Sequence, residues 1–292
     1  MAAFQPYRSY DFSDVLVVGN DLSTVVNVTS TGQTTSSVSL NWLDAKQISL
    51  NNDITGIVIS ANATVSVIAG TTCSHVPQTY RYDCGLIAEQ MIPTDAWENE
   101  YIVPNMPPRA GVLIRVLSLK HQDVCFYTQR GSTCKQFLHQ HLLEFSTGSE
   151  PVVVRSNTTI SVVSYGVEGG PFMTVVPGIK NFMNYYYFVV PSTYSSYNNS
   201  LAVVIQSSQT SGLILDGSTI NSITHDFNVP QPFDSYSVLI LRISTGYHKL
   251  SHQNANVKFG AFLYGNGNLE GYGLPIGIQK ETGKKEQFHS KS

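Results

Sequence analysis

The feature that most constrains the fold of this chain is a β-type pattern that recurs along it. ISLNNDITGIVISANATVSVIA (48–69) aligns with LEFSTGSEPVVVRSNTTISVVS (143–164), which places Asn62 and Asn157 95 residues apart. A third copy, LRISTGYHKLSHQNANVKFGAFLYG (241–265), is weaker in identity but keeps Ser-Thr-Gly and a closing Tyr-Gly. Apolar and polar side chains alternate in TVSVIAG and TISVVSYG, as they do in half-buried strands. The pattern therefore predicts successive copies of one β-unit.

The segments upstream of these copies also correspond. EYIVP (100–104) resembles YFVVP (187–191), and a strand–turn–strand pattern follows each of them. We predict an all-β fold of three related β-units of roughly 60–85 residues, arranged as tandem sandwiches or as a pseudo-threefold assembly. The predicted parts are a first β-unit (10–72), a disulfide-containing connector (73–99), a second β-unit (100–167), a connector (168–182), a third β-unit (183–266), a Gly-rich loop region (267–279) and a disordered tail (280–292).

The composition favours an extracellular β-protein. Charged residues are only 13% of the 292 residues, so Ser, Thr, Asn, Gln and Tyr must supply most of the polar surface. The formal net charge of -3 gives no electrostatic reason to expect a nucleic-acid partner. No apolar run approaches the ~20 residues of a membrane helix, so we expect no membrane insertion.

The four cysteines fall into two close pairs. Four cysteines allow three connectivities, and the close spacing favours Cys73–Cys84 and Cys125–Cys134, with free buried thiols as the alternative. Neither pair has the C-x2-C spacing of a zinc site, so we expect no metal there.

Four glycan acceptor sequons accompany the paired cysteines. Together with the low charge they favour a secreted protein. The start, MAAFQPYRSYDF, lacks the basic and apolar regions of a signal peptide, which fits a mature segment with an added Met and equally fits a cytosolic protein. The predicted N-glycosylation sites are Asn27, Asn62, Asn157 and Asn198.

Candidate catalytic and metal-binding groups are sparse. His139 and His141 would share one face of a strand, but a metal site would need a third ligand from elsewhere. His225-Asp226 has the composition of an oriented base, and Glu98 and Glu100 that of paired sugar-cleaving carboxylates. The sequence contains no nucleophile elbow, metalloprotease helix, P-loop or dinucleotide fingerprint. We therefore predict no catalytic residue, no metal and no cofactor.

Aromatic residues supply the candidate contact surface. In the run YYYF (185–188), strand alternation places the first and third rings on one face and the second and fourth on the other. One face is expected to pack in the core, and the other to contact a sugar or a protein. STYSSYNNS (192–200) has the Tyr, Ser and Asn content of an adaptable binding loop, although a glycan at its sequon would cover part of it. The candidate ligand-contact aromatics are Tyr186, Tyr194 and Tyr197.

Several motifs, taken in order, give the chain a family resemblance. It resembles the N-terminal domain of the IgG Fc-binding protein family, best from about residue 85 to 277. The resemblance implies a secreted, non-enzymatic all-β module of mucus-like or adhesive matrices; the von Willebrand type D domains that often accompany it there are not in this sequence. The matching motifs are EYIVP (100–104), VVVRSNTTISVV (152–163), YYYFVVPSTY (185–194), GLILDG (212–217), YSVLILRISTGYHKLSHQNANVKFGAFLYG (236–265) and YGLPIG (272–277).

These observations predict an extracellular, non-enzymatic binding or adhesion module that recognises a glycan or glycoprotein through loops and exposed aromatics. The resemblance adds immunoglobulin Fc and mucin as candidate partners, and self-association is compatible with it. Two alternatives remain open at this point. One is a structural spacer of a secreted matrix, and the other is a secreted glycan hydrolase whose carboxylates converge only in the fold.

Overall fold

The structure is a computed structural model in which nearly every regular element is a strand. The helices among the described residues are short 3₁₀ segments, namely η1 (Thr94–Ala96), η2 (Ile179–Asn181) and η3 (Ser207–Gly212). In this part of the chain, no helix has the length and apolar content needed to cross a bilayer. The all-β prediction is confirmed. The structure describes residues 2–30, 36–79, 84–137, 142–167, 170–192, 197–220, 222–267 and 270–280.

The first unit is a sandwich of two antiparallel sheets. Its core joins Val15 and Val17 of one sheet to Val26 and Val28 of the other, because alternate residues of each strand point inward. The first sheet has the order β4 (Ala45–Leu50), β1 (Ser13–Gly19), β6 (Val65–Ser74), β7 (Gly85–Gln90). The second has the order β3 (Ser36–Leu40), β2 (Thr24–Thr29), β5 (Val58–Ala61).

The second unit is held together by one long strand that belongs to both of its sheets. This strand, β13 (Val152–Gly166), bends at a register shift between Arg155 and Ile160. Phe126 and Phe145 stack across the core with ring centroids 4.4 Å apart. The first half of β13 pairs with β10 (Gln122–Thr128) and β8 (Glu98–Val103), and β10 pairs with β11 (Gly131–Phe137). The second half pairs with β9 (Val112–Leu117) and β14 (Phe172–Val176), and β9 pairs with β12 (Leu142–Ser146).

The third unit repeats this plan with separate strands. Its core is the set of inward residues of two sheets, including Phe188, Leu201 and Leu263. One sheet has the order β15 (Tyr185–Val190), β21 (Gly246–His252), β17 (Leu213–Leu215), β18 (Ser218–Thr219). The other has the order β19 (Ile223–Asn228), β20 (Tyr236–Arg242), β16 (Asn198–Gln206), β22 (Gly260–Asn266), β23 (Gly271–Pro275).

The strand orders of the first, second and third units correspond, and this confirms three related units. The order β4-β1-β6-β7 recurs as β12-β9-β13-β14 and as β20-β16-β22-β23. The order β3-β2-β5 recurs as β11-β10-β13 and as β18-β17-β21. The second and third units also begin with a strand, β8 or β15, that pairs with β13 or β21. Among the described residues, β5 of the first unit has no such neighbour.

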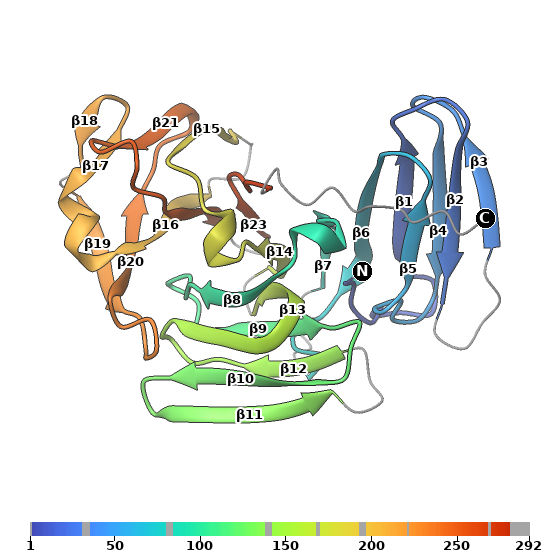
Figure 1. Ribbon diagram of the computed structural model, residues 1–292, viewed down its shortest axis with the longest axis horizontal. Helices are drawn as coiled ribbons and strands as arrows, with labels where there is room; N and C mark the ends of the chain where they lie inside the picture. Colours follow the sequence, from blue (N-terminus) through green and yellow to red (C-terminus); the bar gives the residue numbers. More distant parts are fainter. Residues whose placement is uncertain are drawn as a thin grey trace, which may run out of the picture.

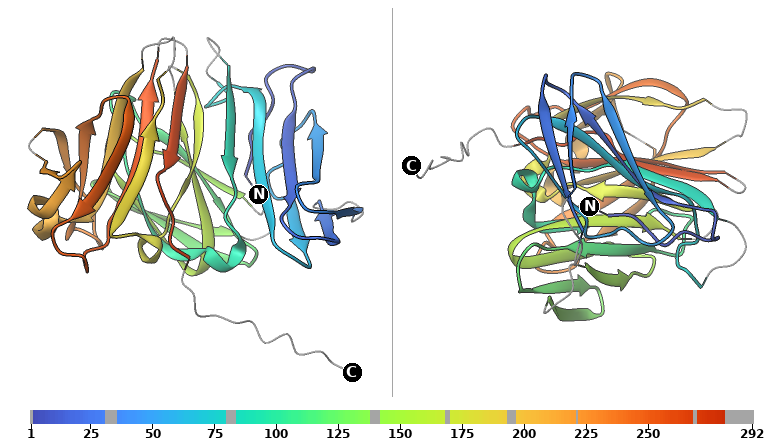
Figure 2. Two further views of the ribbon diagram at one scale, coloured as in Figure 1. Left: turned by 90° about the horizontal axis from the view of Figure 1, so that it is seen from above. Right: turned by 90° about the vertical axis from the view of Figure 1, so that its right-hand side faces the viewer.

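The last strands of the three units meet at the centre of the molecule, where β14 lies between β7 and β23 (Figure 1). Figure 2 (left) shows the units side by side along the long axis. Glu89 of β7 hydrogen-bonds to Thr174 of β14, and a Cβ at Gly273 of β23 would lie 2.2 Å from the Phe172 ring. The strands β7, β14 and β23 lie in segments predicted as connectors or loops, because Gly and Pro at sheet edges obscure the alternation typical of strands.

The N-terminal segment seals the boundary between the first and second units. Phe4 packs on Tyr165 at 5.2 Å, and the Tyr165 hydroxyl donates to the Ala3 carbonyl. The Arg115 guanidinium donates to the same carbonyl (2.6 Å) and also contacts Asp53 of the first unit at 2.8 Å. A buried cation from the second unit therefore joins three parts of the chain.

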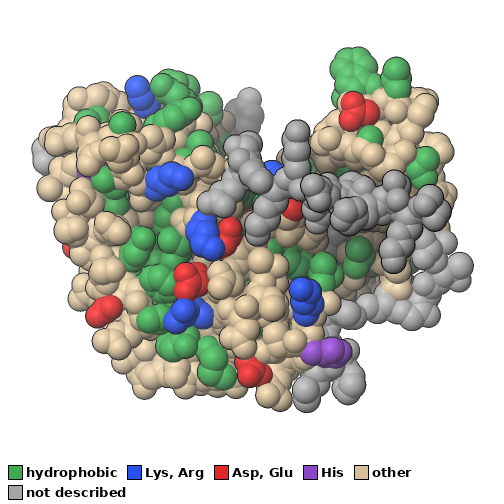
Figure 3. Space-filling view, in the orientation of Figure 1, with side chains coloured by type: hydrophobic (Ala, Val, Ile, Leu, Met, Phe, Trp, Pro, Cys, Tyr) green, Lys and Arg blue, Asp and Glu red, His purple; other side chains and the backbone are tan. Residues whose placement is uncertain are grey.

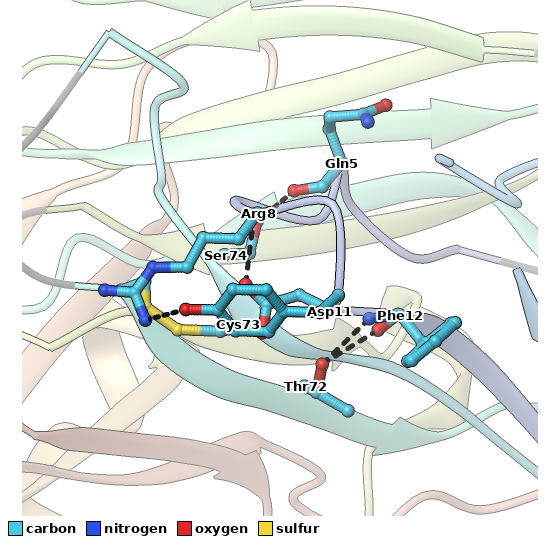
Figure 4. The surroundings of a disulfide bond; sticks show 9 residues. Gln5, Arg8, Asp11, Phe12, Thr72, Cys73 and Ser74 are labelled. Atoms are coloured by element: carbon cyan, nitrogen blue, oxygen red, sulfur yellow. Dashed lines mark hydrogen bonds between the residues drawn. A yellow bond between two sulfur atoms is a disulfide. The ribbon is translucent and has the colours of Figure 1, made fainter. Parts of the chain in front are cut away.

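The two disulfides pair Cys73 with Cys84 and Cys125 with Cys134, the pairing that the spacing favours. Figure 4 shows the N-terminal segment beside the first of them, where the Ser74 hydroxyl donates to the Gln5 carbonyl at 2.7 Å. The second disulfide joins directly opposed residues of β10 and β11.

Candidate functional site

A cluster of exposed aromatic rings lies on the outer face of the third unit. The alternation of β15 buries Tyr186, Phe188 and Val190 and leaves Tyr185 and Tyr187 48% and 52% exposed. On the neighbouring strand β21, Tyr247 is 66% exposed. We call Tyr185, Tyr187, Tyr247 and the adjacent Lys249 the tyrosine ladder.

The rings of the ladder form a continuous surface rather than separate groups. Tyr187 stacks on Tyr247 with centroids 6.1 Å apart and planes at 18°, and meets Tyr185 edge-on at 5.8 Å. The Lys249 ammonium lies 5.4 Å from the centre of the Tyr187 ring. Hydrophobic side chains show at the upper left of Figure 3, in the region of β15 and β21, with Lys or Arg side chains beside them. Flat aromatic faces with hydroxyls and one cation can stack on a sugar ring or bury against a protein.

A polar cluster under the ladder fixes the backbone of β21. The Asp216 carboxylate accepts the Lys249 N–H at 2.8 Å and lies 2.7 Å from Nδ1 of the buried His248. Nε2 of the same imidazole lies 2.9 Å from the Ser244 carbonyl. Desolvation raises the pKa of Asp216, but the hydrogen bonds from Lys249 and His248 outweigh it, so the net pKa is lowered. The carboxylate therefore stays ionised and holds Lys249 in place.

The equivalent face of the second unit is not free. Outward positions there, such as Ile102 and Val153, are completely buried in an apolar cluster that also contains third-unit residues such as Val238, Ile240 and Phe262. Arg155 lies over the Phe233 ring at 5.9 Å, and the Gln129 side chain donates to the carbonyl that ends β19. The same surface is thus an interface in one unit and is exposed in the next.

Tyr186 is a correction to the predicted contact residues. It is 2% exposed, and its hydroxyl donates to the Phe259 carbonyl while accepting the Met183 N–H. Burial raises the pKa of this hydroxyl above its ordinary value. Alternation predicts two faces for β15, and the face that carries Tyr186 is the one that packs in the core of the third unit.

Of the two other predicted aromatics, Tyr197 is among the described residues and is not part of the ladder. Tyr194 lies outside the described residues. Tyr197 is half-buried, donates to Glu270 at 2.9 Å and meets Tyr272 edge-on at 5.3 Å. Its contacts join the residue before β16 to Glu270 and to Tyr272 of β23, which is separated from β16 by β22 in the sheet. Tyr247 was missed, although the alternation of GYHKLSH already places it on the same face as Lys249.

The candidate catalytic carboxylates of β8 each form an ion pair with a neighbouring cation. His139 and His141 lie outside the described residues, and the described part of the chain holds no cluster of three metal-ligating side chains. Glu98 pairs with Lys180 at 3.3 Å, and Glu100 pairs with Arg155 at 2.8 Å. His225 is exposed on β19, where its ring stacks on a neighbouring phenylalanine.

Two hollows among the described residues are lined without a pair of carboxylates. One hollow of about 300 Å³ is lined by Gln5, Pro6, Tyr7, His75 and Gln78, with the rings of Tyr7 and His75 stacked at 3.9 Å. A second, of about 350 Å³, has Glu150 as its one acidic lining residue. Neither hollow has the geometry of a glycan-cleaving site.

The four sequon asparagines differ in accessibility. Asn62, Asn157 and Asn198 are exposed at strand ends or at the bend of β13. Asn27 is half-buried within β2. Three of the four are therefore accessible in the folded chain.

The fold and the ladder together define a class of protein: a module of repeated β-sandwiches with an exposed aromatic surface suited to binding. Residues 3–265 match the family described as IgGFc binding protein, and the chain belongs to this family.

A curated relative, the human IgGFc-binding protein, is 25% identical over 244 residues, which cover 80% of this chain. The match spans only 4% of that much longer protein. No solved structure matches the chain.

Proposed function

We propose that this chain is a secreted, non-enzymatic binding module whose tyrosine ladder recognises a glycoprotein. The observation that carries the proposal is the ladder itself, where Tyr187 and Tyr247 are stacked, exposed and held by a hydrogen-bonded strand. Rigid tyrosines bury large area at low entropic cost and dominate many binding surfaces. Disulfides and accessible sequons support secretion.

The partner to test first is immunoglobulin Fc, because the human relative is named for binding it. Fc carries both protein surface and N-linked glycan, and the ladder suits either. A mucin is the second partner to test. The experiment measures binding of the full chain to immobilised Fc, to Fc stripped of its glycan and to a mucin.

The decisive variant replaces both stacked rings, Tyr187→Ser with Tyr247→Ser, and its control is Tyr10→Ser, an exposed tyrosine of the N-terminal segment. We expect saturable binding that the ladder variant weakens by about tenfold or more and that the control leaves unchanged. Loss of binding on glycan removal would assign the sugar as the ligand. Full affinity in the ladder variant would overturn the proposal, and self-association without any partner binding would favour the spacer.

A further inference from the structure

The buried imidazole of His248 faces a hydrogen-bond acceptor at each of its two ring nitrogens. Nδ1 lies 2.7 Å from the Asp216 carboxylate, and Nε2 lies 2.9 Å from the Ser244 carbonyl. A neutral imidazole carries a hydrogen on one nitrogen only, whereas the imidazolium carries a hydrogen on both. Both contacts are therefore hydrogen bonds only when His248 is protonated.

Neither acceptor can supply the second hydrogen. The Ser244 acceptor is a main-chain carbonyl and has no hydrogen to donate. Desolvation raises the pKa of the Asp216 carboxyl, but the hydrogen bonds from the Lys249 N–H and from His248 lower it overall, so Asp216 is ionised. The His248 side chain is only 8% exposed, so water does not readily replace a lost partner. The proton that completes the pair of hydrogen bonds thus belongs to the imidazole.

The charge on this imidazole has one charged contact. Among the described residues, the charged group that contacts His248 is Asp216, whose side chain is 46% exposed. The strand β15 contributes the uncharged ring of Phe188, with centroids 5.6 Å apart. On β21 itself, Tyr247 and Lys249 lie on the opposite face, because side chains alternate along a strand.

His248 joins two turns at the end of the sheet that carries the ladder. Asp216 lies in the turn between β17 and β18, and Ser244 lies in the turn that leads into β21. Both turns use left-handed backbone, with φ of 52° at Asp216 and 117° at Gly246. Tyr247 directly follows Gly246, and its ring stacks on Tyr187. The imidazolium therefore fixes the turn from which one of the two stacked rings projects.

Loss of the proton releases the Ser244 side of this arrangement. An ionised carboxylate is a stronger acceptor than a carbonyl, so the remaining hydrogen stays on Nδ1, facing Asp216. The Nε2 lone pair then faces the Ser244 carbonyl oxygen, and two acceptors at hydrogen-bond distance repel each other. The turn before Tyr247 is freed, while the hydrogen bond from the Lys249 N–H to Asp216 remains.

We propose that His248 is a proton-dependent clamp for the tyrosine ladder: its imidazolium holds Tyr247 in the stacked geometry, and loss of the proton weakens partner binding as the pH rises. The proposal rests on the proposed function of the ladder and assigns a regulation to it. Histidine ordinarily changes its charge between about pH 5 and 8, so the tight-binding state is the more acidic one.

The first test needs no partner. The full chain, labelled with ¹⁵N, is titrated by NMR from about pH 5 to about pH 9. We expect both ring nitrogens of His248 to carry hydrogens at the acid end, and the ring signals of Tyr187 and Tyr247 to shift with the same midpoint as those of His248. A His248 ring with a single hydrogen throughout, or tyrosine signals that do not follow it, would overturn the clamp.

The second test measures the affinity for immobilised Fc at about pH 5.5 and about pH 8.5. We expect binding to be about three- to tenfold weaker at the higher pH, and His248→Gln to lose this difference because glutamine does not titrate. The matched control is His225→Gln, which removes an exposed histidine of the other sheet and should keep the full difference. Equal pH dependence in the wild type and in His248→Gln would overturn the proposal.

A second variant guards against a merely structural effect of losing the imidazole. Asp216→Asn keeps a side chain that tolerates left-handed backbone and accepts the Lys249 N–H, but it removes the negative charge that favours the imidazolium. The shared NMR midpoint should move to lower pH, and an unchanged midpoint would overturn the clamp. Absence of Fc binding at every pH, with His248 and the tyrosines still titrating together, would overturn the proposed function of the ladder while supporting the clamp.

Discussion

Arg115 provides the sharpest test of how the first two units are joined. Its guanidinium is almost completely buried and contacts the carboxylates of Asp53 at 2.8 Å and Glu144 at 2.7 Å, and it lies 4.0 Å from the centre of the Phe4 ring. Removing one partner of a buried ion pair costs about 3–5 kcal/mol. Because the two carboxylate side chains are 23% and 46% exposed, water can hydrate them. We therefore expect Arg115→Met to lower the free energy of unfolding by about 3 kcal/mol, the lower end of that range.

The assay is urea unfolding followed by the fluorescence of Trp97, which belongs to the same apolar cluster as Phe4. The matched control is Arg155→Met, since Arg155 forms an ion pair of 2.8 Å with Glu100 but has a side chain that is 42% exposed. Exposed pairs contribute about 0–1 kcal/mol, so the control should change stability by no more than that. If both variants lose the same stability, the buried arginine does not hold this boundary and the reasoning fails.

Three further outcomes follow from buried or exposed polar groups. Burial raises the pKa of Glu89 to about 7 from 4.5, so the unfolded chain loses this proton at a lower pH than the folded chain, and the free energy of unfolding falls by up to about 3 kcal/mol as pH rises from 4.5 to 7. Thermal melting at pH 5 and pH 8 should show that this pH dependence of stability is weaker in Glu89→Gln. The same pH dependence in the variant would refute the raised pKa. Tyr101→Phe removes the hydroxyl that pairs with the Glu98 N–H and the Ile160 C=O, and should lower the free energy of unfolding in urea by about 1–3 kcal/mol. The control Tyr185→Phe, at the surface, should change it little. Equal losses in the two variants would contradict the hydrogen-bonding role of Tyr101. When the protein is secreted from mammalian cells, peptide mass spectrometry should find a glycan at the exposed Asn157 and none at Asn27 within β2. A glycan at Asn27 and none at Asn157 would contradict the prediction that exposure in this fold decides which sequon is occupied.

The repeated part of the fold could be predicted because alternation is a local property. The segments around Asn62 and Asn157 form β5–β6 and β13, and the third copy forms β21 and β22. Each is a strand pair with one face in the core, and such pairs carry a period of two in sequence. The all-β class and the three related units follow from this signal alone.

The remaining parts depend on contacts between segments distant in sequence. β7, β14 and β23 read as connectors because they contain Gly or Pro or lie next to them, and only their position at the centre of the molecule makes them strands. Alternation separates Tyr186 from Tyr187 but cannot say which face the opposing sheet covers. The sequence alignment of EYIVP with YFVVP makes Tyr101 equivalent to Phe188. The hydrogen bonds instead show that Tyr101 is equivalent to Tyr186, two residues before Phe188.

The proposed tyrosine ladder lies where equivalent positions of two units differ in exposure. Ile102 is buried under the third unit, while its counterpart Tyr187 is exposed and has become aromatic and polar. Because this face forms an interface in the second unit, its exposed counterpart in the third unit is the surface that we propose for a partner. In a protein built from copies, the comparison of equivalent positions within one chain therefore indicates a candidate binding surface that lies outside the two hollows.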